Sequence, residues 1–432
     1  MAEESPENGM NTPDFEETDG PEGKSKVSLL ANAGGVQVKA TIDNFYRLIT
    51  NHYGKHLRLN EMTGKPEWYD SHRKTWREWT DAQESQARAY FESNYGMYSQ
   101  AKLADALQIY FQDNKVNPLL QILEKLEWDG KPRVEHFLHD VMKADDNEYI
   151  RECSRLIFAG GVHRAYEPGC KFDDMVVLIG GQSAGKSTIV RWLNMDDSFF
   201  REIKTIAGKE GIEAIRGVWI GEVAELMAMT RVKEAEAVKA YITSQEDSYR
   251  PPYGKHVMTI PRRCMFIGTT NNPQFLTDKT GNRRFYPVKV QSFAYKMYDN
   301  AKAIQEYIRQ AWAEAVHLYK EGKLQPYAKK EVLEQIRAAQ EAAMEDDWRI
   351  GAIEQYLEEQ KKMNGATVSV IELWHYALNE PDESKPTRKD SIEITQILSN
   401  IPGWIQCPNP LKTKWGLQKC YRKDNYFALW SK

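Results

Sequence analysis

Short apolar runs alternate with helical patterns through the middle of the chain. Met175–Ile179 is an unbroken apolar run that predicts a buried strand, and Gly217–Gly221 and Cys264–Gly268 are similar in length. Segments with helical periodicity lie between these runs up to about Val290. Such alternation is typical of a mostly parallel sheet covered by helices. The middle of the chain is therefore predicted to be an α/β domain.

Amphipathic patterns predict several helices before this region. Periodic apolar positions indicate helices at Ile42–Ile49, at about Asp81–Ser93 and at about 103–110. Short strand-like segments are expected at His56–Asn60 and near Trp68. The N-terminal domain is therefore predicted to be mainly helical.

The C-terminal part combines helical patterns with strand-like segments rich in tryptophan. Helices are expected near Ile350–Lys361, Val368–Leu378 and Ser391–Leu398, and Lys414–Leu417 belongs to the strand-like end. Three helices followed by a hairpin predict an α+β domain that resembles a winged helix. The chain is thus divided into a disordered acidic tail, the mainly helical N-terminal domain, the α/β core and this C-terminal domain, at residues 1–35, 36–145, 146–345 and 346–432.

A glycine-rich segment directly follows the first core strand. It matches the pattern G-x-x-x-x-G-K-[ST] and consists of Gly180, Gly181, Gln182, Ser183, Ala184, Gly185, Lys186, Ser187 and Thr188. Glycines let main-chain N–H groups surround phosphate oxygens, and the helix that follows adds its positive end. Lys186 can contact the β- and γ-phosphates, and Ser187 can bind Mg²⁺. An ordinary glycine turn is the alternative, but a strand before and a helix after favour a site for ATP with Mg²⁺.

Polar residues after the next two apolar runs could complete an ATPase site. Glu222 follows the run 217–221 and could hold Mg²⁺, while Glu225 could orient the attacking water. Asn271 follows the run 264–268 and could contact the γ-phosphate, with Asn272 in reserve. As an alternative, one of the glutamates could be an acidic residue that stabilises the start of a helix. The asparagines could instead cap a polar turn.

Positive charge is concentrated between residues 250 and 290. Eight Lys or Arg side chains lie there with one acid, whereas the whole chain has a net charge of −4. Such a block requires an anionic partner or acidic neighbours. Arg283 and Arg284 could stabilise the transition state on a neighbouring subunit, although DNA contact is an alternative for them.

A turn-rich segment within this block predicts a basic hairpin. Arg250, Tyr253, Lys255 and His256 are its candidate DNA-binding residues, with Lys255 and His256 at the tip. Pro-Pro and Tyr-Gly pairs mark the turn. In the pore of a ring, such a tip could hold a single strand through its phosphates. An exposed turn with incidental charge is the alternative.

Composition narrows the class of protein without identifying it. Charged residues make up 28% and apolar residues 41% of the 432 positions. No apolar run reaches the ~20 residues needed to span a bilayer. The N-terminal residues do not resemble a secretory signal, and the five cysteines contain no C-x-x-C pair. A cytoplasmic protein without a membrane partner is therefore expected.

Several motifs together resemble the virulence-associated protein E family of phages and mobile elements. They are Trp128–Arg133, Pro168–Asp173, the phosphate loop, Glu222–Leu226, Arg250–Gly254 and Gly281–Phe285. The resemblance also extends to superfamily 3 helicases, in which a Lys-His pair tips the pore hairpin. It implies a P-loop NTPase core of the AAA+ type, an asparagine sensor, an arginine finger and a homo-oligomeric ring, with a hexamer expected.

These features favour an ATP-dependent DNA helicase that serves replication of a mobile element. Single-stranded DNA in the ring pore is the expected partner, and duplex origin DNA is a candidate for the C-terminal domain. One alternative is a DNA-independent ATPase switch that acts in phage interference or protein assembly. A small-molecule kinase is a third reading, but it has no use for the hairpin or for an arginine from a neighbour.

Overall fold

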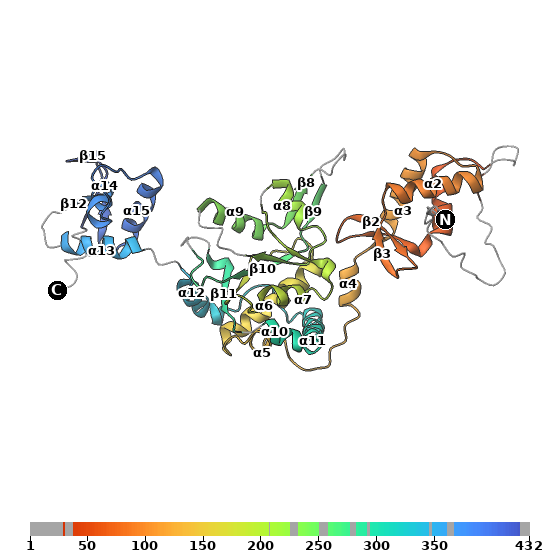
Figure 1. Ribbon diagram of the computed structural model, residues 1–432, viewed down its shortest axis with the longest axis horizontal. Coiled ribbons are helices and arrows are strands. Elements are labelled where there is room, and N and C mark those ends of the chain that lie inside the picture. The colour runs from red at the N-terminus through yellow and green to blue at the C-terminus, as the bar shows by residue number, and fades with distance from the viewer. Residues whose placement is uncertain are drawn as a thin grey trace, which may run out of the picture. The chain divides into compact units, whose positions relative to one another are not determined.

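The computed structural model describes most of the chain (Figure 1). The described residues are 29–30, 38–206, 208–224, 232–249, 258–276, 282–291, 294–344, 348–360 and 367–423. The acidic tail predicted at 1–35 lies almost entirely outside them. The described residues form two compact units, one up to Met344 and one after it.

Helices and a small sheet share one hydrophobic core at the start of the first unit. The helical elements are α1 (Ile42–His52), η1 (Gly54–His56), α2 (Asp81–Tyr95) and α3 (Gln100–Asp113). The strands are β1 (Leu57–Asn60), β2 (Lys65–Asp70), β3 (Thr75–Glu78) and β4 (Lys115–Val116). Their order is β3-β2-β1-β4, and only the β1–β4 pair is parallel. Phe45, Trp68 and Phe91 are buried between the helices and the sheet.

The second part of the first unit is built around a five-stranded sheet. Its strands are β5 (Met175–Ile179), β6 (Phe200–Glu202), β7 (Ile220–Ala224), β10 (Met265–Thr270) and β11 (Phe285–Lys289). The order is β11-β5-β10-β7-β6, and every neighbouring pair is parallel. The predicted α/β core with a parallel sheet is therefore confirmed.

Helices cover both faces of this sheet (Figure 1). The helices of this part are α4 (Pro118–Leu123), α5 (Phe137–Met142), α6 (Glu148–Tyr166), α7 (Lys186–Leu193), α8 (Gly208–Ala214), α9 (Val232–Thr243), α10 (Ala294–Asp299), α11 (Ala301–Lys320) and α12 (Leu333–Ala342), with turns η2 (Asp197–Phe199), η4 (Asn282–Arg284) and η5 (Lys330–Val332). Val176 and Leu178 of β5 face the core formed with α6, α7 and α11. Val177 and Ile179 face the other core, which contains Val238 of α9. Burial on both faces explains why β5 is continuously apolar.

Strand β7 lies three residues later than the apolar run predicts. The run 217–221 was expected to form the strand and to end in Glu222, whereas the strand is Ile220–Ala224 with Glu222 at its centre. Gly217 has a φ of +80°, which breaks an extended chain, and its N–H donates to the main-chain oxygen of Met62. Trp219 is fully buried, and its indole donates to the main-chain oxygen of Gly161. Hydrophobicity at 217–219 therefore reflects packing before the strand.

The buried carboxyl of Asp174, directly before β5, predicts a pH-dependent stability. Burial raises the pKa of Asp174 from 3.8 to about 6. The folded chain therefore takes up a proton between about pH 4 and 6, and stability falls as pH rises through this interval. Above pH 6 the cost is at most about 3 kcal/mol. Urea unfolding should show Asp174→Asn stabilising the protein near pH 7.5 but hardly at pH 4. Asp173→Asn is the control, and an equal effect of Asp174→Asn at both pH values would contradict the assignment.

The second unit combines helices with a three-stranded sheet. Its helical elements are α13 (Trp348–Gln360), α14 (Val370–Glu372), η6 (Leu373–Ala377) and α15 (Arg388–Asn400). Its strands are β12 (Thr367–Ser369), β13 (Trp404–Gln406), β14 (Leu411–Thr413), β15 (Gly416–Gln418) and β16 (Cys420–Lys423). The sheet order is β12-β16-β13, both pairs are antiparallel, and β14 and β15 form a separate hairpin. Val368 at the start of the helix predicted at Val368–Leu378 lies in β12, so helical structure begins only at Val370.

No helix among the described residues is long and apolar enough to cross a membrane.

Candidate functional site

The glycine-rich segment connects β5 to α7, as the sequence predicts. Gly185 is the N-cap of α7 and has a φ of +75°, a left-handed conformation that favours glycine. Ser183 also has a positive φ, of +63°, although it carries a side chain. Gln182 and Ser183 are exposed, while Ala184 and Gly185 are buried. The loop therefore presents a strained main chain at the surface and the N-terminus of a helix behind it.

Lys186 joins the loop to the end of a neighbouring strand. Its ammonium donates to the main-chain oxygens of Gly180 and Gly181 at 2.6 and 2.9 Å, and to Asn271 Oδ1 at 2.8 Å. Asn271 directly follows β10, which pairs with β5 in parallel register. Burial lowers the pKa of Lys186, and Glu222 opposes this shift. The structure thus brings Lys186 and Asn271 together as the sequence predicts.

Glu222 lies on the other side of the loop and accepts two hydroxyl hydrogen bonds. Ser187 Oγ donates to Glu222 Oε1 at 2.6 Å, and Thr269 Oγ1 donates to the same oxygen at 2.7 Å. Glu222 is only 2% exposed. These bonds fix the direction of the carboxylate toward the first turn of α7. Ser187 and Glu222, the two predicted metal ligands, are therefore neighbours.

The oxygen donors at this position fit Mg²⁺. Mg²⁺ prefers carboxylate and hydroxyl oxygens, and it usually keeps several waters and binds substrate phosphates. The hydroxyl of Ser187 and the carboxylate of Glu222 are such oxygen ligands, and a hydrogen bond joins them directly. Across the described part of the chain, no group of three or more His, Cys, Asp or Glu forms an all-protein metal cage. The chemistry therefore suits an ion shared with phosphates.

Thr269 was missed by the sequence analysis. Register places Ile267 of β10 beside Glu222 of β7, so Thr269, two residues on, points to the same face of the sheet. Thr269 is buried, with 4% exposure. The period-two spacing of Thr269 and Asn271 could have pointed to it. Thr269 therefore orients Glu222 without a motif of its own.

The two adjacent asparagines differ in their surroundings. Asn271 is exposed and contacts Lys186, whereas Asn272 closes a turn. Asn272 Nδ2 donates to the main-chain oxygen of Gln274 at 2.6 Å, and Asn272 Oδ1 accepts from the N–H of Gln274 at 2.9 Å. Asn271 therefore contacts the phosphate loop, whereas Asn272 stabilises a turn.

Arg283 and Arg284 lie in η4, just before β11. They are at the amino ends of the parallel strands, whereas the phosphate loop lies at the carboxyl ends. Phe285, the first residue of β11, pairs with Met175, the first residue of β5, while the loop follows the last residue of β5. Five residues of strand span roughly 16 Å. Arg283 is exposed and Arg284 is half-buried. Neither arginine is placed at the phosphate loop of its own chain.

The arms of the predicted basic hairpin are present. β8 (Glu246–Tyr249) and β9 (Met258–Pro261) are antiparallel, and Tyr249 pairs with Met258. The candidate DNA-binding residues Arg250, Tyr253, Lys255 and His256 fall in the connection, outside the described residues. Glu225 also lies outside them. The hairpin itself is confirmed by the pairing of its arms.

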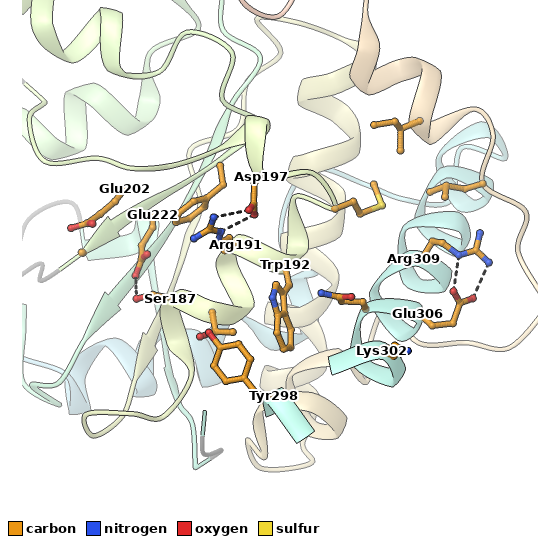
Figure 2. Close-up of a pocket in the computed structure, with 17 residues that line it drawn as sticks. Ser187, Arg191, Trp192, Asp197, Glu202, Glu222, Tyr298, Lys302, Glu306 and Arg309 are labelled. Carbon is orange, nitrogen blue, oxygen red and sulfur yellow. Dashed lines mark hydrogen bonds and ion pairs between the residues drawn. The ribbon is translucent and has the colours of Figure 1, made fainter. Parts of the chain in front are cut away.

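A pocket of about 990 Å³ opens beside the phosphate loop (Figure 2). Ser187 and Glu222 line one end, and Arg309 of α11 lies at the other. Between them, the rings of Trp192 and Tyr298 meet edge to face with centroids 5.6 Å apart. This volume is at the upper end of the ~300–1,000 Å³ usual for small-molecule sites. The predicted metal ligands thus border a hollow large enough for a small molecule.

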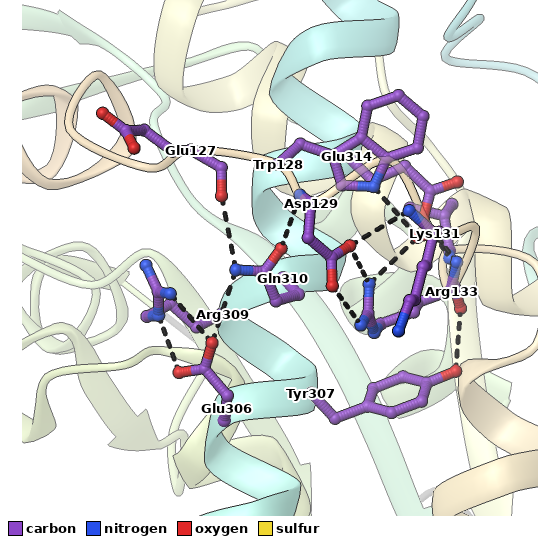
Figure 3. Close-up of polar contacts among 11 residues, drawn as sticks. Glu127, Trp128, Asp129, Lys131, Arg133, Glu306, Tyr307, Arg309, Gln310 and Glu314 are labelled. Atoms are coloured by element: carbon purple, nitrogen blue, oxygen red, sulfur yellow. Dashed lines mark hydrogen bonds and ion pairs between the residues drawn. The ribbon is translucent and has the colours of Figure 1, made fainter.

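The motif Trp128–Arg133 has a structural role (Figure 3). Both oxygens of Asp129 accept hydrogen bonds from the Arg133 guanidinium at 2.7 Å. Gln310 of α11 accepts from the N–H of Asp129 at 3.0 Å, and Glu314 accepts from the N–H of Val134 at 2.9 Å. Burial raises the pKa of Glu314. The motif therefore fastens the segment between α4 and α5 onto α11.

Comparison with solved structures finds similarity to the C-terminal region of NrS-1. One apo structure of that region is 12% identical, with a TM-score of 0.47, and the match covers 87% of this chain and 97% of that one. An A-form apo structure of the same region is 12% identical, with a TM-score of 0.48, and the match covers 88% and 99%. No curated protein matches this chain.

A family model for the virulence-associated protein E-like domain matches residues 123–345. The match includes the phosphate loop, all five strands of the parallel sheet and the segment fastened to α11. It covers more than half of the 432 residues. The chain therefore belongs to the virulence-associated protein E-like family.

Proposed function

We propose that this protein is an ATP-dependent DNA motor, a helicase that serves replication of a phage or other mobile element. The observation that carries the proposal is the convergence of Lys186, Ser187, Glu222 and Asn271 from three parallel strands. Counted along the chain, the strands of the sheet have the order 5-1-4-3-2, which supports a core of the AAA+ type. Family membership supports the assignment to mobile elements.

ATP would be held by its phosphates at the loop. Main-chain N–H groups of the loop and the N-terminus of α7 would bind phosphate oxygens, and Lys186 would exchange its bonds to main-chain oxygens for the β- and γ-phosphates. Ser187 and Glu222 would hold Mg²⁺, which neutralises charge on the phosphates when bound. The 2.8 Å hydrogen bond from Lys186 to Asn271 supports a role for that amide beside the γ-phosphate.

Hydrolysis would require a second subunit. Asn271, with Glu222 or Glu225, would orient the attacking water toward the γ-phosphate. Charge that develops in the transition state needs a cation. Arg283 cannot supply it within its own subunit, because it lies at the amino ends of the strands and the phosphate loop lies at their carboxyl ends. Arg283 of a neighbouring subunit would supply this cation, because it is exposed and Arg284 is half-buried. A closed ring, expected to be a hexamer, would complete each site in this way.

The motor would act on DNA through the hairpin between β8 and β9. Lys255 and His256 lie in its connection, within the basic block at 250–290. We expect single-stranded DNA to stimulate ATP hydrolysis and Lys255→Ala to lose that stimulation, because a phosphate contact disappears. Lys320→Ala, which removes one exposed charge from α11, is the matched control and should keep the stimulation. Turnover that ignores DNA in the wild-type protein would contradict a motor.

That contradicting result would favour the second candidate, a DNA-independent ATPase switch. It uses the same loop, Glu222 and Asn271, but its output is a change of conformation or of assembly. The basic hairpin is the feature that favours the motor over the switch, because a switch has no need for the cluster of Arg250, Lys255 and His256 in its connection.

The C-terminal unit would be a winged-helix-like module. Its order of elements is helix, strand, three helical segments, strand, hairpin and strand, with β16 between β12 and β13. Such modules bind either DNA or other proteins. The charge distribution on this module distinguishes the two possibilities.

A further inference from the structure

The hairpin of β14 and β15, together with the residues around it, is strongly basic. Residues 401–423 contain no acid and five cations, which are Lys412, Lys414, Lys419, Arg422 and Lys423. All five are exposed. Lys412, Lys419 and Arg422 form no ion pair with a carboxylate within the described part of the chain. The charge and exposure of this segment therefore make it complementary to a polyanion.

An exposed leucine lies among these cations. Leu417 of β15 is 72% exposed and pairs directly with Lys412 of β14, so both side chains share one face of the hairpin. A single exposed leucine needs no explanation by itself. Beside a lysine on a narrow hairpin, however, it has the character of the apolar wedges that enter the minor groove of duplex DNA.

The tip of the hairpin is fixed to the rest of the unit. The Trp415 ring stacks on His375 of η6, with centroids 5.7 Å apart and an interplanar angle of 22°. The ammonium of Lys414 lies 4.6 Å from the centroid of the Tyr376 ring and 4.3 Å from that of Trp415. These contacts order the hairpin in advance, which lowers the entropic cost of binding. Lys414 thus has a structural role, unlike Lys412.

The segment before α15 has the opposite charge. Residues 379–387 contain Glu380, Asp382 and Glu383 but only one lysine, Lys385. In α15 itself, Arg388 and Lys389 are balanced by Asp390 and Glu393. Phosphates would be repelled by this turn and would gain little from the helix. The helix that precedes the hairpin is therefore the less suitable side for DNA.

We propose that the C-terminal unit binds duplex DNA through the hairpin rather than through α15. Lys412, Lys419 and Arg422 contact phosphates, and Leu417 enters the minor groove between them. This contact needs neither ATP nor the phosphate loop. The C-terminal unit thus provides a binding site for duplex DNA that is separate from the basic hairpin of the core.

The test measures binding of the full chain to a blunt-ended fluorescent duplex without nucleotide, by anisotropy over a range of salt concentrations. Replacing Lys412, Lys419 and Arg422 together by alanine should weaken binding at least tenfold. Each lost phosphate contact lowers the slope of log affinity against log salt by about 0.9, so the slope should fall by about 2.7. Leu417→Ala keeps every charge and should weaken binding severalfold with an unchanged slope.

The matched control removes positive charge from the start of α15 and from the segment before it. Lys385→Ala combined with Arg388→Ala should change the affinity less than twofold. A large loss in this control variant would assign DNA binding to the start of α15 and the segment before it, and would overturn the proposal. Wild-type affinity and slope in the triple variant would also overturn it and would indicate a protein partner for the hairpin. The same holds if the triple variant loses affinity for single-stranded DNA as strongly as for duplex.

Discussion

Lys186→Ala is expected to lower ATP turnover by about 10²–10³-fold, the loss typical when one donor to a developing charge is removed. In the structure the Lys186 ammonium is already fixed between the loop oxygens and Asn271. Alanine removes the only side-chain cation of the glycine-rich segment. A steady-state assay of phosphate release with saturating Mg²⁺ measures this effect directly.

Gln182→Ala is the matched control for this substitution. Gln182 occupies a variable position of the same loop, and its side chain is exposed. Gln182 would contact phosphate only through its main-chain N–H, which alanine retains. Turnover of the Gln182→Ala variant should therefore stay within a few-fold of the wild-type value. If both variants lost activity equally, the loop would be sensitive to any change and Lys186 would have no special role.

Arg283→Ala is expected to lower turnover by about 10³-fold or more, as for an arginine finger. Arg284→Ala should cost much less, because Arg284 is half-buried beside β11 and less able to extend toward a neighbour. Single-turnover assays with bound ATP separate this effect from any change in affinity. A larger loss in Arg284→Ala would reverse the assignment between the two residues.

Mixing two inactive variants tests whether the arginine acts between subunits. Lys186→Ala protein still supplies Arg283, and Arg283→Ala protein still supplies Lys186. Some interfaces in a mixed ring therefore contain both intact residues, and activity should return on mixing. Activity that stays at the sum of the separate variants would mean that Arg283 does not act in trans.

Much of the core could be predicted because its signals are local. A five-residue apolar run followed by a contiguous motif placed the phosphate loop between β5 and α7. Asn271 could be expected beside Lys186, 85 positions away, because parallel strands end at one edge of a sheet. The spacing of two residues to Asn271 points to Thr269, but its contact with Glu222 also depends on the register between β10 and β7, which no local pattern specifies.

Short elements held by distant contacts were the hardest to predict. Lys414–Leu417 has the composition of a strand, yet Lys414 and Trp415 form the turn of a hairpin because they pack on Tyr376 and His375. The strand that contains Glu222 begins later than predicted. Trp219 is hydrophobic because it packs in the core before the strand, so the hydrophobic run does not coincide with the residues that pair in the sheet. In both cases tertiary packing overrides the local pattern.

Strand displacement measures the proposed helicase activity itself. A forked DNA duplex with a labelled strand is incubated with wild-type protein, ATP and Mg²⁺, and in parallel with Lys186→Ala protein. We expect the wild-type protein to release the labelled strand with ATP, and we expect no release by Lys186→Ala protein or without ATP. Release by Lys186→Ala at the wild-type rate would contradict the ATP-driven mechanism.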